Sequence, residues 1–274
     1  MRRPRGDGRR PPPTPPKTER ASPTLEARRT LWVFCEGKKT EPGWLEHLHR
    51  RFYGLNLRIE VESAVGVPQT IFQRAKAKVT DIRRSPRRVE HMDEVWAVFD
   101  RDGFLRIPDV WQGLRDNGIG LVFSNPCFEI WPVLHLQPQT SEIHRGNLQA
   151  LLHQAHPSYH HERSPQLDWA ALQPKTGAAV ADSIALHLRH EGADHSLNHN
   201  PSNTAWLLHE RCANAEDQTG RWFITLARQH PSLSPLAWML AEPLRAQVQQ
   251  DLGSVPYPAP PREGVIGDAR RIRS

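Results

Sequence analysis

Blocks of apolar residues recur along residues 30–136, each followed by a segment with helical spacing. Residues 30–35 form an apolar run that is typical of a fully buried strand, and the segments DEVWAVFDRDGF and IGLVFSN contain two more such runs. Residues 57–65 instead alternate apolar and charged side chains, which predicts a strand with one exposed face near a sheet edge. Helices are predicted at residues 40–53, 68–84, 107–118 and 126–136, the last beginning at Pro126.

This alternation predicts an α/β fold, in which a parallel sheet of about four strands is covered by helices on both faces. Strand patterns stop near residue 140, and helical segments follow at residues 146–154, 176–190, 203–214 and 235–250. The sequence Asn-Pro-Ser-Asn at residues 200–203 is interpreted as a helix cap. We therefore expect an α/β core at residues 30–139 and a helical extension at residues 140–252.

Positive charge is concentrated at the start of the chain. The formal net charge of the 274 residues is +6, and residues 1–29 account for all of it, with eight Arg and one Lys against three acids. This Pro-rich segment is predicted to be a disordered arm that either binds nucleic-acid phosphates or is only a solvated tail. Residues 253–274 are predicted to be a flexible tail. Because no stretch approaches the roughly 18 consecutive apolar residues of a membrane span, we expect a cytoplasmic protein with no membrane contact.

The cysteines and histidines do not follow a metal-binding pattern. Cys35, Cys127 and Cys212 lack Cys-x-x-Cys spacing and are predicted to be reduced, mostly buried thiols. His156, His160 and His161 have spacings that could place two of them on one helix face as zinc ligands, but Pro157 and Ser158 disfavour a continuous helix.

Acidic residues follow the ends of three predicted strands. Glu36 comes after the first strand, Asp100 and Asp102 come after the third, and Glu129 follows the fourth. Ligands of open parallel sheets bind beyond the carboxyl ends of the strands, so these side chains are expected to converge. Crowded carboxylates repel one another unless a cation compensates them, and hard oxygen ligands suit Mg²⁺ or Mn²⁺. The sequence therefore predicts a divalent-metal site formed by these four acids.

Each of these residues also has a plainer interpretation. Asp100 could begin a turn, and Glu129 could be a first-turn acid of a helix, although its apolar neighbours make an unpaired charge costly there. Lys38 and Lys39 precede a predicted helix start, where they would either hold a phosphate or remain a solvated pair. The occurrence of acids at three strand ends favours the functional interpretation.

Four segments resemble motifs of the RloB family in both their amino-acid sequence and their order along the chain. These segments are FCEGKKTEPGWLEHL, DEVWAVFDRDGF, SNPCFEIWPVLHL and NPSNTAWLL, and the resemblance covers about residues 30–213. It implies a Toprim-like catalytic fold. Glu36 matches the Toprim glutamate after the first strand, while Asp100 and Asp102 match the Asp-x-Asp pair that binds divalent metal in such enzymes.

The resemblance also implies further site residues and partners. Asn125 and Glu129 match the SNPCFE motif, and Lys175 matches a lysine that precedes a family helix. Family members are associated with phage-defence and restriction loci, often beside an ATPase gene. This association implies an effector nuclease that is controlled by a partner protein.

Together these observations lead to a hypothesis of Mg²⁺- or Mn²⁺-dependent phosphodiester hydrolysis in DNA or RNA, with transfer RNA as one candidate substrate. Glu36, Lys38 and Glu129 would take part in catalysis, and Lys38, Lys39, Asn125 and Lys175 would contact the substrate phosphates. Two alternatives stay open. One is a phosphatase of the haloacid dehalogenase type, although Phe104 stands where that class usually has Thr or Val. The other is a non-catalytic module that binds nucleic acid or an ATPase partner.

Overall fold

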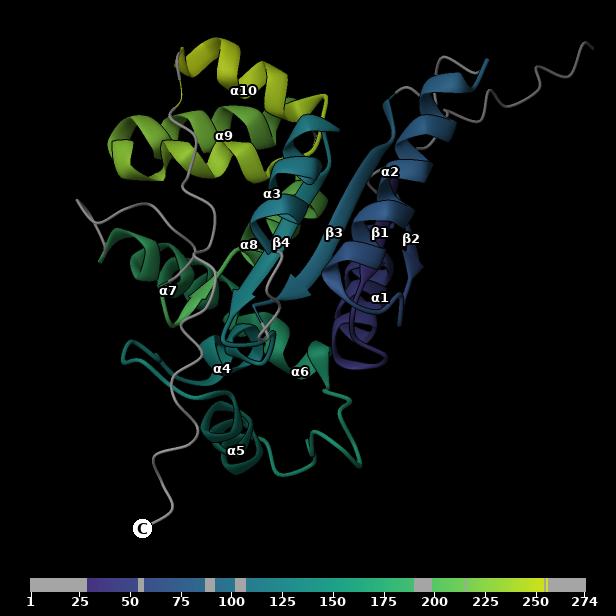
Figure 1. Ribbon diagram of the computed structural model, residues 1–274. Coiled ribbons are helices and arrows are strands. Elements are labelled where there is room, and N and C mark those ends of the chain that lie inside the picture. Colours follow the sequence, from purple (N-terminus) through teal and green to yellow (C-terminus); the bar gives the residue numbers. More distant parts are fainter. Residues whose placement is uncertain are drawn as a thin grey trace, which may run out of the picture.

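The structure of the protein is a computed structural model (Figure 1) that describes residues 29–53, 57–86, 92–101, 107–189, 199–214, 216–253 and 255. The expectations for the basic arm and for the C-terminal tail fall almost entirely outside these residues. Asp102, Gly103 and Phe104 also lie outside them. The arrangement below concerns the described residues.

Five strands form one sheet in the order β2-β1-β3-β4-β5. The strands are β1 (Arg29–Cys35), β2 (Leu57–Glu62), β3 (Glu94–Asp100), β4 (Gly120–Asn125) and β5 (Ser202–Asn203). The first four are parallel, whereas β5 pairs antiparallel with the end of β4. The α/β prediction is therefore confirmed, and the segment at residues 200–203 adds a fifth strand. The Asn203 side chain also accepts a hydrogen bond from the Ala205 amide, so this segment caps the next helix as well.

Burial along the strands follows their place in the sheet. Every residue of β3 and β4 is buried, as expected for central strands that helices cover on both faces. β2 lies at the edge and alternates buried and more exposed positions, as its alternating sequence predicts. The three cysteines are free and buried, which confirms that prediction.

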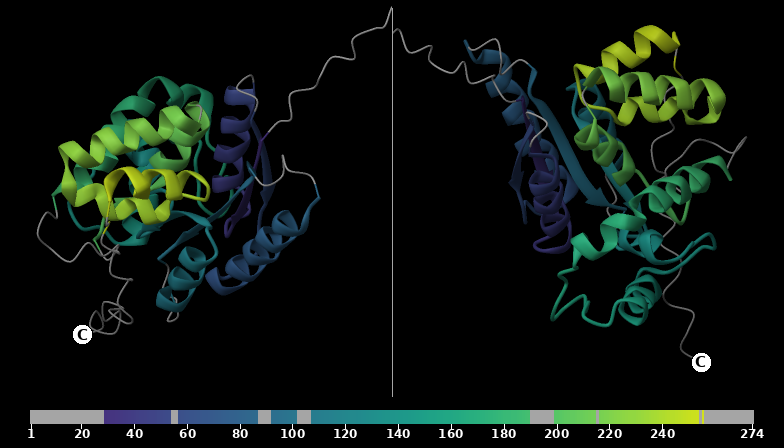
Figure 2. Two further views of the ribbon diagram at one scale, coloured as in Figure 1. Left: turned by 90° about the horizontal axis from the view of Figure 1, so that it is seen from above. Right: turned by 180° about the vertical axis from the view of Figure 1, so that it is seen from behind.

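Helices cover both faces of the sheet. On one face α2 (Pro68–Arg84) and α3 (Ile107–Asp116) pack against each other and against β1, β3 and β4. On the other face α1 (Thr40–Phe52) and α8 (Ala205–Ala213) contact each other and the sheet. The view from above in Figure 2 shows these two layers. The sequence predicted all four helices to within two residues of their observed bounds.

Four short helical elements gather near the carboxyl ends of the parallel strands, where the β3 arrow points in Figure 1. They are α4 (Ile130–Leu136), α5 (Arg145–Ala155), α6 (Trp169–Leu172) and the 3₁₀ helix η3 (Gln173–Lys175), which leads into α7 (Thr176–Leu188). The helix predicted to begin at Pro126 begins at Ile130 instead. The residues between form a turn, in which the Phe128 backbone amide is hydrogen-bonded to the Asp100 side chain.

The last part of the chain differs most from the prediction. It contains α9 (Glu216–Gln229), the 3₁₀ helix η4 (Pro231–Met239) and α10 (Leu244–Leu252), which pack together. The sequence did not predict α9, because the Thr219-Gly220 pair near its start is typical of a loop. Gly220 instead allows close packing, since a Cβ atom there would lie 3.3 Å from Leu244 Cδ1. The single helix predicted at residues 235–250 is interrupted before Leu244.

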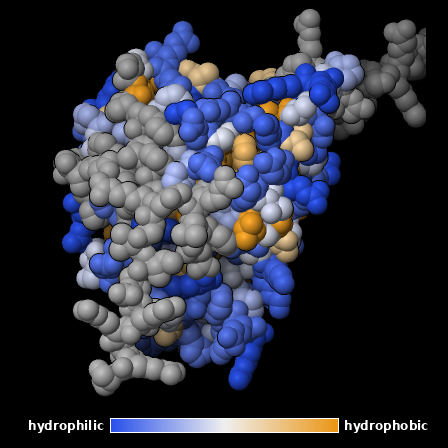
Figure 3. Space-filling view, in the orientation of Figure 1, coloured by the Kyte–Doolittle hydropathy of each residue, from blue (hydrophilic) through white to orange (hydrophobic). Residues whose placement is uncertain are grey.

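The visible surface is mostly hydrophilic. Figure 3 shows hydrophobic residues singly or in small groups among polar ones. None of the helices in the described part of the chain is long and apolar enough to cross a membrane.

A buried ion pair joins the start of β3 to α8. The Glu94 side chain is fully buried, and its Oε1 lies 2.6 Å from Arg211 Nη2 and 2.7 Å from Arg211 Nε. Its Oε2 accepts a hydrogen bond from Trp96 Nε1 at 3.1 Å, and Arg29 Nη1 lies 3.8 Å from Oε1. These contacts hold three separate parts of the chain together at the amino end of the sheet.

Replacing Arg211 by Ala is expected to destabilise the fold by about 3 kcal/mol, because it removes the main partner of a buried carboxylate. Chemical denaturation measures this change. The control is Arg74→Ala, which removes an exposed pair with Glu62 at 3.7 Å and should cost less than about 1 kcal/mol. Equal, small effects of the two substitutions would contradict a structural role for the buried pair.

Candidate active site

The register of the sheet brings Glu36 and Asp100 to the same edge. β1 and β3 are parallel neighbours, and Cys35 lies opposite Val98. The Glu36 amide continues this pairing by donating to the Val98 carbonyl at 3.2 Å. Asp100 is the last residue of β3 and is only 8% exposed. Two acids therefore follow the carboxyl ends of adjacent strands, where ligands of such sheets bind.

The first turn of α1 adds a third acid, Glu41, which is 7% exposed. Its carboxylate lies against Gly37, where a Cβ atom would collide with it. Gly37 therefore lets the strand-to-helix turn approach the acid closely. Glu41 falls in the first turn of the helix predicted at residues 40–53, and it was not among the predicted site residues. A glycine between an acid and a helix start was the available clue.

Burial and mutual repulsion raise the pKa values of two members of the cluster. Burial raises the pKa of Asp100 well above its usual value, and the charges of Glu41, Glu129 and Glu36 add to the shift. Burial likewise raises the pKa of Glu41 to about 7, against backbone hydrogen bonds at Glu41 and Gly37, while Glu129 and Glu36 raise it further. We call Glu36, Glu41, Asp100 and Glu129 the carboxylate cluster.

Glu129 keeps its charge because it has its own donors. Its Oε1 lies 2.6 Å from the Tyr159 hydroxyl, which donates to it, and 3.0 Å from His161 Nδ1. Burial raises the pKa of Glu129, but hydrogen bonds with His161, Tyr159 and Cys127 outweigh burial and lower it to about 2. The hydrogen bond to Glu129 in turn raises the pKa of His161. This pairing favours the charged form of Glu129, whose charge acts on Asp100.

Tyr159 and His161 were not predicted as partners of Glu129. They lie 30 and 32 residues further along the chain, and the sequence suggested only a weak zinc interpretation for His161. No local pattern could have shown this contact, because a loop between α5 and α6 brings these residues back to the start of α4.

The donors of the carboxylate cluster suit a hard divalent cation. All are carboxylate oxygens, and a cation would stabilise the charged forms of Asp100 and Glu41 that burial disfavours. Among the described residues, no group of three or more His, Cys, Asp or Glu is arranged to hold a metal ion, and Asp102 lies outside that range. Mg²⁺ commonly takes only one or two protein carboxylates, with water and substrate phosphate completing its shell. The residues present therefore fit Mg²⁺ in their chemistry.

The predicted phosphate-binding residues occupy different settings. Lys38 and Lys39 are exposed in the turn between β1 and α1. Lys175 is exposed at the junction of η3 and α7. Asn125 is 3% exposed, and its side-chain amide donates to the His199 carbonyl at 3.0 Å, which helps to hold β5 beside β4. Substrate contacts by these four residues stay predictions.

Comparison with known proteins identifies the family. A family model described as RloB-like protein matches residues 31–211, about two thirds of the chain. The chain belongs to the RloB-like family. The matched region extends from β1 to α8 and so includes the whole carboxylate cluster, Tyr159 and His161. No curated protein and no solved structure matches the chain.

The RloB-like match crosses residue 140, where the sequence predicted a boundary between core and extension. The structure explains why the two parts belong together at this site. Tyr159 and His161, the partners of Glu129, come from the residues after 140, and so does β5, which completes the sheet beside β4.

Glu41 should make the stability of the protein depend on pH when divalent cations are absent. Its folded-state pKa of about 7 lies above the ordinary 4.5, so its ionisation lowers stability as the pH rises between these values. Glu41→Gln keeps an acceptor for the backbone amides but cannot ionise. We expect it to be more stable than the wild type by on the order of 2 kcal/mol near pH 8 in chelator, with the gain vanishing near pH 4.

Denaturation midpoints across this pH range measure the effect. Glu46→Gln is the matched control, because Glu46 is an exposed acid of the same helix, paired with Arg50. A pH-independent effect of Glu41→Gln, or the same profile for both variants, would show that Glu41 is not held in a repulsive cluster.

Proposed function

We propose that this RloB-like protein is a Mg²⁺- or Mn²⁺-dependent nuclease with a Toprim-like active site, which hydrolyses phosphodiester bonds of DNA or RNA. The observation that carries the proposal is the carboxylate cluster at the carboxyl ends of two adjacent parallel strands, with the pKa of Asp100 raised well above its usual value. Such a cluster can bind a phosphate only if a positive charge compensates the negative charges of the acids and of the phosphate. A divalent cation supplies that charge.

The acids have distinct roles in this proposal. Asp100 would hold the cation together with Asp102, its Asp-x-Asp partner. A bound divalent cation would supply Lewis acidity and charge compensation for the phosphate. Glu36 is only half-buried, whereas Asp100 is buried, so Glu36 is the acid that can also exchange a proton with the attacking water.

The surrounding residues tune this chemistry. Hydrogen bonds with Tyr159 and His161 keep Glu129 ionised. The charge of Glu129 destabilises an ionised Asp100 that has no cation beside it, and a bound cation relieves this repulsion. Lys38 is exposed next to the start of α1, where it would bind a substrate phosphate through its charge. The exposed Lys39 beside it adds positive charge for the same purpose.

The biological setting is part of the proposal. We infer an effector role in anti-phage defence, with cleavage controlled by an ATPase partner encoded nearby. Membership of the RloB-like family supports this inference. The basic N-terminal segment would add affinity for nucleic acid through its charge.

The test is induced expression in bacteria of the wild type, Glu36→Gln and Asp100→Asn, with and without the neighbouring ATPase. Total RNA and DNA are then resolved for fragments. We expect both variants to lose cleavage by at least about 100-fold, because each removes a negative charge from the catalytic cluster. Purified wild type should lose cleavage in chelator and regain it with Mg²⁺.

Glu62→Gln is the matched control, because Glu62 is a partly exposed acid at the end of the neighbouring strand β2. It should cleave like the wild type. Cleavage by Asp100→Asn at the wild-type rate would refute the site. Intact nucleic acid under every condition would favour a binding module, and hydrolysis of a small phosphate ester alone would favour a phosphatase.

A further inference from the structure

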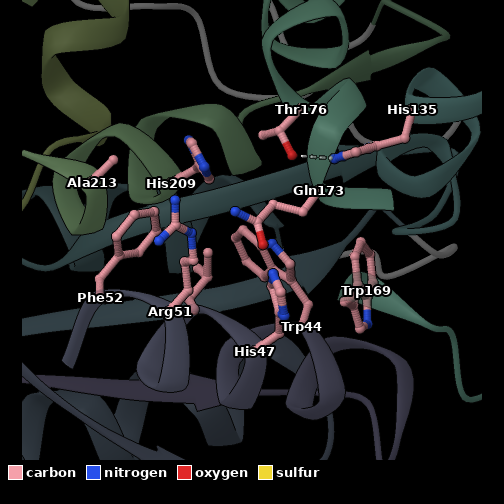
Figure 4. A pocket seen from close by; sticks show the side chains of 11 residues that line it. Trp44, His47, Arg51, Phe52, His135, Trp169, Gln173, Thr176, His209 and Ala213 are labelled. Atoms are coloured by element: carbon pink, nitrogen blue, oxygen red, sulfur yellow. Dashed lines mark hydrogen bonds between the residues drawn. The ribbon is translucent and has the colours of Figure 1, made fainter. Parts of the chain in front are cut away.

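A second feature of the fold is a cavity of about 280 Å³ along α1. Figure 4 shows it between α1 and the elements α4, α6, η3, α7 and α8. Glu41 begins the same helix, and Arg51 at the cavity rim lies ten residues further on, about 15 Å along the axis. The ring of Trp44, which lines the cavity, packs against the rings of Phe128 and Trp131. None of the four acids of the carboxylate cluster lines the cavity.

The floor of the cavity is aromatic and buried. Trp44, His135 and Trp169 line it and are each no more than 5% exposed. His135 Nδ1 lies 2.9 Å from the Trp131 carbonyl and therefore donates to it, which leaves Nε2 to accept from the Thr176 hydroxyl at 3.3 Å. Burial lowers the pKa of His135 to about 4, so the ring is neutral at neutral pH. The floor is uncharged, and the His135 and Trp169 rings meet edge to face at 80°, so a planar ring would contact them at their edges and the half-buried Phe52 ring by its side.

The rim of the cavity is polar and cationic. Arg51 is exposed, and its guanidinium lies 5.7 Å from the centre of the Phe52 ring. The Phe52 ring meets His209 of α8 edge to face at 5.7 Å, and His47 is half-buried one turn before Arg51. None of the described residues that line the cavity is Asp or Glu. His209 Nδ1 lies 3.2 Å from Glu210 Oε1, and the charge of Asp168 acts on His47, so the exposed Arg51 is the main positive charge at the rim. An anionic group would therefore be favoured at this rim.

Two further side chains can form hydrogen bonds with the edge of a ligand ring. Gln173 and Thr176 line the cavity from η3 and the first turn of α7, and both are half-buried. In Figure 4 the Gln173 amide projects between the Trp44 and His47 side of the cavity and the helix that carries His209. An amide supplies both donors and an acceptor, the combination that base edges require.

We propose that this cavity binds one nucleotide, with the base over the aromatic floor and the phosphate at Arg51. Aromatic faces, an amide and a cation are the three features by which proteins hold single unstacked nucleotides. The volume of about 280 Å³ lies just below the roughly 300–1,000 Å³ of small-ligand pockets, which limits the occupant to a single nucleotide. The occupant is either a free mononucleotide or one base of a bound strand. This proposal goes beyond the proposed nuclease and does not depend on it.

Calorimetric titration of the full chain with the four ribonucleoside 5′-monophosphates tests the proposal. Adenosine, inorganic phosphate and a short oligonucleotide are titrated in parallel, all in chelator so that the carboxylate cluster neither binds cations nor cleaves. We expect at least one mononucleotide to bind more tightly than adenosine or phosphate alone. Arg51→Ala should weaken that binding by about tenfold or more, because it removes a charge-assisted contact.

Arg50→Ala is the matched control, because this substitution removes the same charge from the adjacent position. Arg50 pairs with Glu46 and does not line the cavity. It should bind like the wild type, and so should Asp100→Asn, whether or not the protein proves to be a nuclease. Gln173→Ala should change the preference among the four bases.

The outcomes distinguish a free mononucleotide from one base of a bound strand as the occupant of the cavity. Binding of the oligonucleotide alone, weakened by Arg51→Ala and not by Arg50→Ala, supports a base of a strand as the occupant. Equal binding of phosphate and mononucleotides overturns the proposal, because it shows an anion site without base recognition. Absence of any Arg51-dependent binding also overturns it.

Discussion

Repulsion among buried carboxylates is the physical constraint on which the rest of this site depends. Parallel strands end at one edge, so the acids that follow β1 and β3 become neighbours whatever their separation in the sequence. The turn after β1 then brings Glu41 to the same place, against Gly37. Burial raises the pKa of both Glu41 and Asp100, so the protein without a cation carries an electrostatic cost. Buried acids with such raised pKa values are typical of functional sites.

The part of the chain after residue 140 belongs to this site. Tyr159 and His161 stabilise the charge of Glu129, which raises the pKa of Asp100. The pair of Glu94 with Arg211 anchors α8 at the opposite end of β3. α8 and α6 in turn form walls of the cavity along α1. The helical region thus serves both as a support for the carboxylate cluster and as the frame of a separate pocket.

The sequence predicted the sheet well, because burial alone distinguishes continuous apolar runs from an alternating edge strand. It also predicted that Glu36, Asp100 and Glu129 would converge, which their mutual effects on pKa support. It could not single out Glu41, since a first-turn acid has a purely structural explanation. It missed the partners of Glu129 because they depend on contacts between distant residues, and α9 because Gly220 marks helix packing there and not a loop. The position of Asp102 stays untested, because it lies outside the described residues.

The central claim is that the carboxylate cluster binds a divalent cation. Titration of the protein with Mn²⁺, followed by the electron paramagnetic resonance signal of the free ion, tests it without any assay of cleavage. The account predicts that the wild type removes free Mn²⁺ in a saturable way, that Mg²⁺ competes, and that Asp100→Asn removes far less. A wild-type protein that leaves the Mn²⁺ signal unchanged, or an Asp100→Asn variant that binds Mn²⁺ equally well, would contradict the account.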